Sequence, residues 1–190
     1  DNQKYETNLD AIIAKLGNLT SVKTTEEKPS GAFSFMVNSN EYFIPLGNNI
    51  DVAGEIEKLA DYSYPIKDIS AGPASGTFPC DGMIIAPCSI RTLSAVANSH
   101  SSDLLTRTAD VTLKEKRPLV LMVRETPFHL GHLRLMQQVA ESGGVIFPPV
   151  PAFYNKPKDL DEMISHTSKR ALEQVGIEIK EMDRWTGPLG

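Results

Sequence analysis

The sequence predicts an α/β protein in which a parallel sheet lies between layers of helices. Three compact apolar runs carry this prediction: GMIIAPC at 82–88, RPLVLMV at 117–123 and VIFPPV at 145–150. Strands that are buried on both faces of a sheet have such continuous apolar runs, whereas half-exposed strands alternate. A helical pattern follows each run after a short connection, which is typical of a three-layer parallel sheet.

Two helices are expected between the first two strands, at 92–98 and 101–115. Ser101 or Ser102 is the candidate N-cap of the second helix, because a serine hydroxyl accepts a hydrogen bond from the first N–H groups of a helix. The two helices and their flanking strands form one continuous α/β unit.

A helix over 129–142 follows the second strand, and a closing helix over 159–176 follows the third. The former is expected to end at the Gly143–Gly144 pair. The latter has Asp159 or Asp161 near its start, where a carboxylate can cap the helix. The predicted architecture is a Rossmann or flavodoxin-like sheet.

The first third of the chain has a different pattern. Apolar residues at helical spacing predict a helix over 8–16, and two short strands are expected at 33–37 and 41–46. The NSN sequence between these strands is a hairpin signal. A second helix is expected over 49–59, and the stretch 60–79 is a loop rich in Pro, Gly, Ser and Asp. We therefore expect an atypical α-β-β-α segment before the parallel sheet.

The composition excludes several classes of protein. The chain has 190 residues, 41% of them hydrophobic and 23% charged, which is ordinary for a globular protein. Its net charge of -5 argues against non-specific attraction to nucleic acid or to an anionic membrane. No apolar run is long enough to span a bilayer, and the N-terminus is polar without a signal-peptide core. We expect a cytoplasmic protein with no membrane or nucleic-acid partner.

The cysteines do not indicate a metal site or a disulfide. Cys80 and Cys88 fit neither a disulfide framework nor the spacing of zinc ligands. Cys88 ends a predicted buried strand, where small cysteines are common as packing residues. No motif places a base beside Cys88, so a role as nucleophile is not expected.

Polar side chains follow each predicted strand at its carboxyl end. Ser89 and Thr92 come after the first strand, Arg124 and Glu125 after the second, and Tyr154 after the third. Ligands of parallel sheets bind at this edge. These five residues are therefore candidates for one binding site.

Basic side chains on the predicted helices add to this site. Arg107 and Lys114 are two helical turns apart and share one face, and Arg170 lies on the closing helix. With Arg124 and the Tyr154 hydroxyl they would form a strong phosphate site. Each of them taken alone is better explained as a solvated helix-face charge or a salt-bridge partner, and only their joint placement at the strand ends favours a phosphate site.

Five short motifs occur in a fixed order along the chain. The chain contains PASG at 73–76, followed in order by PCS..TLSA, R.ADV.LKE, RE.P and P.FY. These motifs, at this spacing, resemble those of the UbiX-type flavin prenyltransferases, formerly labelled aromatic acid decarboxylases. The resemblance covers about residues 60–190.

The resemblance implies a reaction and its partners. Such enzymes bind reduced FMN and transfer a dimethylallyl group to it from dimethylallyl monophosphate. The product, prenylated FMN, serves a UbiD-type decarboxylase, in ubiquinone biosynthesis among other pathways. The family requires no metal and generally forms large homo-oligomers with sites shared between subunits.

The resemblance also implies roles for individual residues. Those expected to contact the cofactor are Ser89, Thr92 and Arg107. Those expected to hold the prenyl phosphate are Lys114, Arg124, Tyr154 and Arg170. Glu125 would transfer a proton near that phosphate, and with Lys114 and Tyr154 it makes up the expected catalytic set. Glu125 is alternatively a structural ion-pair partner of Arg124.

Residues 1–59 resemble a different protein. They are similar to a C-terminal segment of bacterial valyl-tRNA synthetases, and they lack the first strand and the TGASG phosphate loop of flavin prenyltransferases. We therefore expect two units, 1–59 and 60–190, joined near Leu59–Ala60. On this basis the chain is alternatively a catalytically incomplete chimera, or an accessory module related to tRNA synthetases.

The HLGH sequence at 129–132 resembles the nucleotide-binding signature of class I aminoacyl-tRNA synthetases. That signature requires a Lys-Met-Ser-Lys-Ser-type companion loop and a larger chain. His129 and His132 are three residues apart and have no third metal ligand at suitable spacing. We interpret both as packing or capping histidines.

Overall fold

The three apolar runs form a parallel sheet. The computed structural model describes residues 60–180, together with 182, 184 and 187. In this part of the chain the strands are β1 (Met83–Cys88), β2 (Leu119–Val123) and β3 (Val145–Ile146), in the order β1-β2-β3. All pairs are parallel. The predicted α-β-β-α segment lies outside the described residues.

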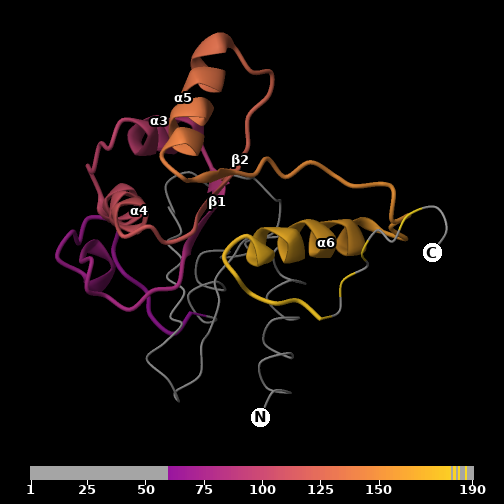
Figure 1. Ribbon diagram of the computed structural model, residues 1–190, viewed down its shortest axis with the longest axis horizontal. Helices are drawn as coiled ribbons and strands as arrows, with labels where there is room; N and C mark the ends of the chain where they lie inside the picture. Colours follow the sequence, from indigo (N-terminus) through magenta and orange to yellow (C-terminus); the bar gives the residue numbers. More distant parts are fainter. Residues whose placement is uncertain (1–59, 181, 183, 185–186, 188–190) are drawn as a thin grey trace, which may run out of the picture.

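Helices cover both faces of this sheet (Figure 1). The connection from β1 to β2 contains α3 (Ile90–Ala97) and α4 (Leu104–Lys114). The connection from β2 to β3 contains α5 (Leu130–Glu141), and α6 (Leu160–Glu173) follows β3. A short 3-10 helix, η2 (Gly72–Ala74), lies within the predicted 60–79 loop. The three-layer α/β architecture is confirmed.

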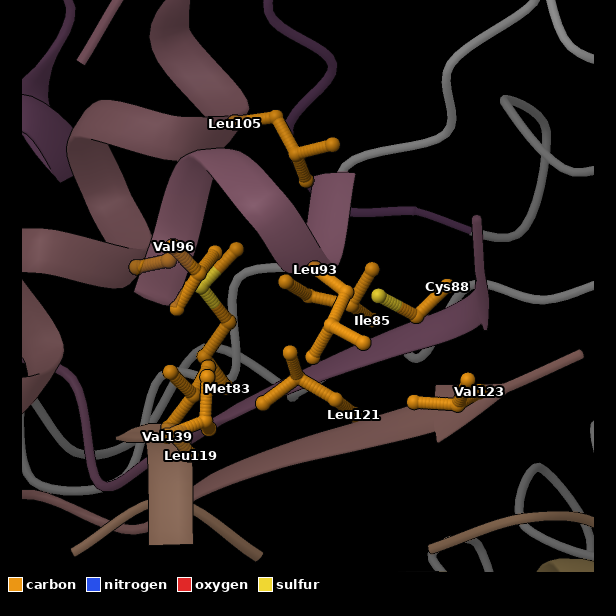
Figure 2. Packing of buried hydrophobic residues seen from close by; sticks show 11 residues of the cluster. Met83, Ile85, Cys88, Leu93, Val96, Leu105, Leu119, Leu121, Val123 and Val139 are labelled. Atoms are coloured by element: carbon orange, nitrogen blue, oxygen red, sulfur yellow. The ribbon is translucent and has the colours of Figure 1, made fainter. Parts of the chain in front are cut away.

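Alternate residues of each strand point into two separate hydrophobic cores. Met83, Ile85, Leu119 and Leu121 face the core that α3, α4 and α5 complete, and Figure 2 shows this packing. Ile84 and Val120 face the other core. That second core includes two buried residues at the end of α6 and just beyond it, Leu172 and Val175. The sheet therefore separates α3, α4 and α5 from α6.

The helix ends correct one sequence expectation and confirm others. The N-cap of α4 is Asp103, not Ser101 or Ser102. Its carboxylate accepts a hydrogen bond from the Thr106 N–H, while the Thr106 hydroxyl caps in return, forming a capping box. Asp159 is the N-cap of α6, as expected.

The end of α5 is also as expected from sequence. The helix ends at Glu141, and Gly143 follows with φ of 94°. This left-handed conformation favours glycine, because other residues would place a Cβ against their own backbone.

Among the described helices, none is long and apolar enough to cross a bilayer.

The core between the sheet and helices α3, α4 and α5 is the larger of the two cores. The fully buried side chain of Leu121 provides a test of its packing. Leu121→Ala is expected to lower the free energy of unfolding by about 2–5 kcal/mol, because it leaves a cavity between β2 and the helices. Leu121→Met conserves volume and should cost less than about 1.5 kcal/mol. Urea unfolding at a fixed protein concentration measures both. Equal losses for the two variants would contradict this packing.

Candidate active site

The carboxyl ends of β1 and β2 lie side by side. The Arg124 N–H donates to the Cys88 carbonyl at 3.1 Å, just beyond the last strand residue Val123. Ser89 is the N-cap of α3 on the neighbouring strand end. The residues expected after the first two strands therefore share one edge of the sheet.

The start of α3 presents a set of hydrogen-bonding groups at this edge. The Ser89 hydroxyl accepts from the Thr92 N–H at 3.2 Å and lies 3.1 Å from the Thr92 hydroxyl. Ile90 and Arg91 occupy the first turn, where backbone N–H groups have no intrahelical acceptor. This end of the helix attracts electronegative atoms of a ligand.

Arg124 and Glu125 have exposed side chains at the same edge. The Thr126 N–H donates to the Glu125 carboxylate at 3.0 Å, which fixes one of its oxygens at the turn. Within residues 60–180, no ion pair joins Arg124 to Glu125. The structural ion-pair alternative for Glu125 therefore receives no support from this arrangement.

Arg107 lies on the face of α4 that packs against the loop before β1. Its Nε donates to the Ala74 carbonyl at 3.3 Å, and its guanidinium pairs with Asp110 at 3.2 Å. The salt bridge joins residues three apart on one helical face, a surface arrangement of small energy. Arg107 is thereby held beside the PASG sequence.

Lys114 lies at the end of α4, beside the same loop. It forms an ion pair with Glu115. A Cβ at Gly76 would lie 2.8 Å from the Lys114 Nζ, so glycine is needed for the loop to approach the pair without displacing it. The hydrogen bond and the charge of Lys114 lower the pKa of Glu115; burial opposes this effect, and the charge of Arg117 adds to it.

Arg117 fastens this loop, a role that the sequence did not suggest. Its guanidinium donates to the Phe78 carbonyl at 3.0 Å and to the Gly76 carbonyl at 2.7 Å. The planar guanidinium suits two acceptors at once. No local pattern indicated this contact, because Arg117 and Phe78 are 39 residues apart in the chain.

Tyr154 packs on the face of α6 that also carries Arg170. The Tyr154 ring packs edge-on against the His166 ring, with centroids 6.0 Å apart and an interplanar angle of 85°. His166 is buried and lies four residues before Arg170, so both side chains lie on the same helical face. The structure thus places two of the residues expected to hold phosphate on the same side of α6.

Arg170 is also linked to a carboxylate on α6. Its guanidinium donates to Glu173, which accepts a second hydrogen bond from Arg184. Burial raises the pKa of Glu173, but the hydrogen bonds and charges of Arg184 and Arg170 outweigh it and hold this pKa below its ordinary value. Glu173 was not expected from sequence, although its i+3 spacing from Arg170 was visible.

One chain does not gather all the expected phosphate-binding residues at one place. Lys114 lies on α4 and Arg170 on α6, and the sheet separates these helices (Figure 1). Lys114 also stands near the amino end of β2, whereas Arg124 follows its carboxyl end. The single cluster expected at the strand ends is therefore divided within one chain.

The structure confirms the interpretation of the two histidines and of Cys88. His129 is the N-cap of α5, and its Nδ1 accepts from the Gly131 N–H at 2.9 Å. The His132 ring packs on His129 with centroids 3.7 Å apart. Cys88 is fully buried in the larger core. In the part of the chain that the structure describes, no group of three or more His, Cys, Asp and Glu side chains is arranged to hold a metal.

Comparison with known proteins identifies the family. The Flavoprotein family model matches residues 36–164. The flavin prenyltransferase UbiX of Escherichia coli (strain K12) is 56% identical over 135 residues, which are 70% of this chain and 71% of the relative. The UbiX of Archaeoglobus fulgidus is 42% identical over 177 residues, covering 92% of this chain and 97% of the relative. The chain belongs to the flavoprotein family and, within it, to the UbiX flavin prenyltransferases.

Two solved structures resemble this fold closely. AnUbiX, crystallised with FMN and dimethylallyl pyrophosphate, has a TM-score of 0.77 and 37% identity, covering 94% of this chain and 89% of its own. A dodecameric FMN-dependent UbiX-like decarboxylase from Escherichia coli O157:H7 has a TM-score of 0.76 and 34% identity, covering 95% and 91%.

The matches to flavoproteins extend into the N-terminal segment. The family model starts at residue 36, and the Archaeoglobus match covers 92% of the chain, so both extend into the segment before Ala60. These comparisons give no support to the valyl-tRNA synthetase resemblance. The boundary near Leu59–Ala60 stays a prediction.

The Arg117 contacts predict that Arg117→Ala loosens the loop at 74–78. The variant leaves the Gly76 and Phe78 carbonyls without their charged donor, and we expect a loss of about 1–3 kcal/mol in local stability. Amide hydrogen exchange at Ser75 and Phe78 measures this loss. Arg134→Ala, at an exposed position on α5, is the matched control. The prediction is wrong if both variants exchange alike.

The lowered pKa of Glu173 predicts a pH dependence of stability. Because the folded carboxylate has the lower pKa, its stabilisation is complete above the ordinary glutamate pKa of about 4.3 and is lost as pH falls through the folded value. The difference in unfolding free energy between the wild type and Glu173→Gln should stay constant above about pH 5.5 and shrink below about pH 4.3. A difference that grows on acidification would contradict the ion pairs that Glu173 forms with Arg170 and Arg184.

Proposed function

We propose that this protein is a flavin prenyltransferase. It transfers a dimethylallyl group from dimethylallyl monophosphate to reduced FMN, and the prenylated FMN serves a UbiD-type decarboxylase. The observation that carries this proposal is the similarity over 94% of the chain to AnUbiX, whose crystals contain FMN and dimethylallyl pyrophosphate. The 56% identity to the Escherichia coli UbiX supports it independently.

The start of α3 fits a flavin. Flavin rings present carbonyl oxygens and ring nitrogens, and this helix end offers the paired hydroxyls of Ser89 and Thr92 with backbone N–H donors beside them. We assign Ser89, Thr92 and Arg107 to cofactor binding. When bound, reduced FMN supplies the nucleophilic ring to which the prenyl group becomes attached.

The cationic residues act on the leaving group. The carbon–oxygen bond of the ester breaks and its electron pair stays with the phosphate, so negative charge develops there. We assign four residues to hold that charge: Lys114, Arg124, Tyr154 and Arg170. Fixed cations and a phenol donor stabilise developing charge without reorganising at the moment of reaction.

Glu125 is suited to proton transfer beside this phosphate. Its exposed carboxylate has one oxygen fixed by the Thr126 N–H. The other accepts no hydrogen bond from the residues that the structure describes. That oxygen is available to exchange a proton with the departing phosphate, and geometry of this kind is the first requirement for a general acid or base.

The division of the phosphate-binding residues supports a site built by more than one subunit. Within one chain the sheet lies between Lys114 and Arg170. If both bind one phosphate, they come from different copies of the chain in a closed homo-oligomer. The UbiX-like decarboxylase that this fold resembles is dodecameric, in agreement with such an assembly.

We propose that this enzyme is cytoplasmic, because Cys80 and Cys88 are both free thiols, as is usual in that reducing compartment.

We also propose a role in ubiquinone biosynthesis through the decarboxylase that receives the product. The alternatives are an inactive chimera and a module related to tRNA synthetases, and each predicts a protein that does not form prenylated FMN.

Purified protein tests these alternatives directly. With FMN it should turn yellow, and with reduced FMN and dimethylallyl monophosphate it should yield prenylated FMN that mass spectrometry detects. Binding of FMN without product would favour the inactive chimera. Failure to bind FMN at micromolar protein, together with salt-sensitive binding of tRNA, would favour the synthetase-related module.

Lys114→Ala tests the phosphate site. Loss of one charge-assisted hydrogen bond, about 1.5–3 kcal/mol, should raise the KM for dimethylallyl monophosphate roughly tenfold to a hundredfold. FMN affinity should be almost unchanged, as fluorescence titration would measure. Lys116→Ala, at an exposed position two residues further on, is the control. An equal effect of both variants would remove Lys114 from the site.

A further inference from the structure

The carboxylate of Glu173 lies between two guanidinium groups. One oxygen accepts from Arg170 at 2.5 Å and the other accepts from Arg184 at 2.5 Å. The Glu173 side chain is only 13% exposed, whereas those of Arg170 and Arg184 are 43% and 57% exposed. A nearly buried carboxylate therefore holds one end of a guanidinium that reaches toward solvent.

The same face of α6 carries the contact with Tyr154. His166, Arg170 and Glu173 are spaced i, i+4 and i+7, which places them in one stripe along the helix. His166 is 8% exposed and packs against the Tyr154 ring. The stripe thus brings the Tyr154 ring and the Arg170 guanidinium to the same side of α6, with Glu173 one turn beyond Arg170.

The charges of this group favour an anion as ligand. Glu173 alone would neutralise Arg170, but Arg184 adds a second positive charge, so the three side chains together carry a net charge of about +1. A guanidinium has five N–H donors, and Glu173 takes one of those on Arg170. The others have no acceptor among the residues that the structure describes.

We propose that Glu173 is a positioning residue for substrate binding. It fixes the Arg170 guanidinium in the orientation that receives the phosphate of dimethylallyl monophosphate, and Arg184 holds Glu173 in place for this task. The inference rests on the proposed function, in which Arg170 binds that phosphate. Glu173 itself makes no contact with substrate and acts through Arg170.

Glu173→Gln distinguishes positioning from simple charge balance by the sign of its effect. The variant removes a negative charge close to Arg170, which by electrostatics alone would tighten the binding of a phosphate. If Glu173 positions Arg170, the amide holds it poorly and phosphate binding weakens. We expect the KM for dimethylallyl monophosphate to rise about fivefold to tenfold, with a smaller change in kcat.

The measurement uses the FMN-loaded protein. Calorimetric titration with inorganic phosphate gives an affinity that is independent of turnover, and steady-state kinetics give KM and kcat. Glu178→Gln, the same charge change at an exposed position beyond α6, is the matched control and should leave both quantities at wild-type values. Weaker phosphate binding in Glu173→Gln alone supports the proposal, whereas unchanged or tighter binding overturns it.

A double-mutant cycle separates this role from a structural one. In an Arg170→Ala background, Glu173→Gln should not weaken phosphate binding further, because the guanidinium that it positions is gone. Additive losses would show that Glu173 acts on the fold and would overturn the proposal. If Glu173→Gln does not fold, Glu173→Asp carries the test, since it keeps the charge and withdraws the carboxylate by one methylene; unchanged phosphate binding in that variant would overturn the proposal.

The failure of this proposal differs from a failure of the proposed function. A wild-type protein that forms no prenylated FMN contradicts the proposed function, whatever Glu173 does. An active wild-type protein whose Glu173→Gln variant binds phosphate normally contradicts only the positioning role.

Discussion

A sheet buried on both faces is the constraint on which the rest of this structure depends. The side chains of β1 and β2 alternate between two cores, so helices must cover both sides to keep these strands from water. The helices that connect adjacent parallel strands lie on the same face of the sheet. The reason is that crossover connections are right-handed and these strands follow one another in the same direction across the sheet. The closing helix α6 packs on the other face, and this placement puts Arg170 across the sheet from Arg107 and Lys114 on α4.

The two faces carry different parts of the proposed chemistry. On one side, α4 and the loop at 74–78 form a braced unit in which Arg107, Lys114 and Arg117 contact the loop. On the other side, the Tyr154 ring packs against His166 of α6, and Arg170 lies one turn further along the same face, where it pairs with Glu173. The edge formed by β1 and β2 contributes Ser89 and Arg124. Assembly of copies is the means by which such separated groups can meet at one substrate phosphate.

The sequence alone predicted the three strands and four of the described helices, because continuous apolar runs and helical spacing reflect burial directly. Asp103 was missed as the cap of α4 because three capping residues, Ser101, Ser102 and Asp103, stand side by side and only the backbone decides among them. Long-range contacts were also hidden: nothing local in the sequence connects Arg117 to the carbonyl of Phe78. The face of the sheet on which α6 packs could not be predicted from the sequence pattern either, because no later strand in the described residues fixes the direction of this last connection.

The separation of Lys114 from Arg170 by the sheet can be tested by mixing two variants that each bind the substrate phosphate weakly, at a substrate concentration below the KM of both. Lys114→Ala and Arg170→Ala are purified separately, dissociated and reassembled together, and prenylated FMN formation is measured. If one site takes these residues from two subunits, random mixing should restore about a quarter of the sites, because each variant supplies the side chain that the other lacks. Activity that stays at the level of the unmixed variants would contradict the account.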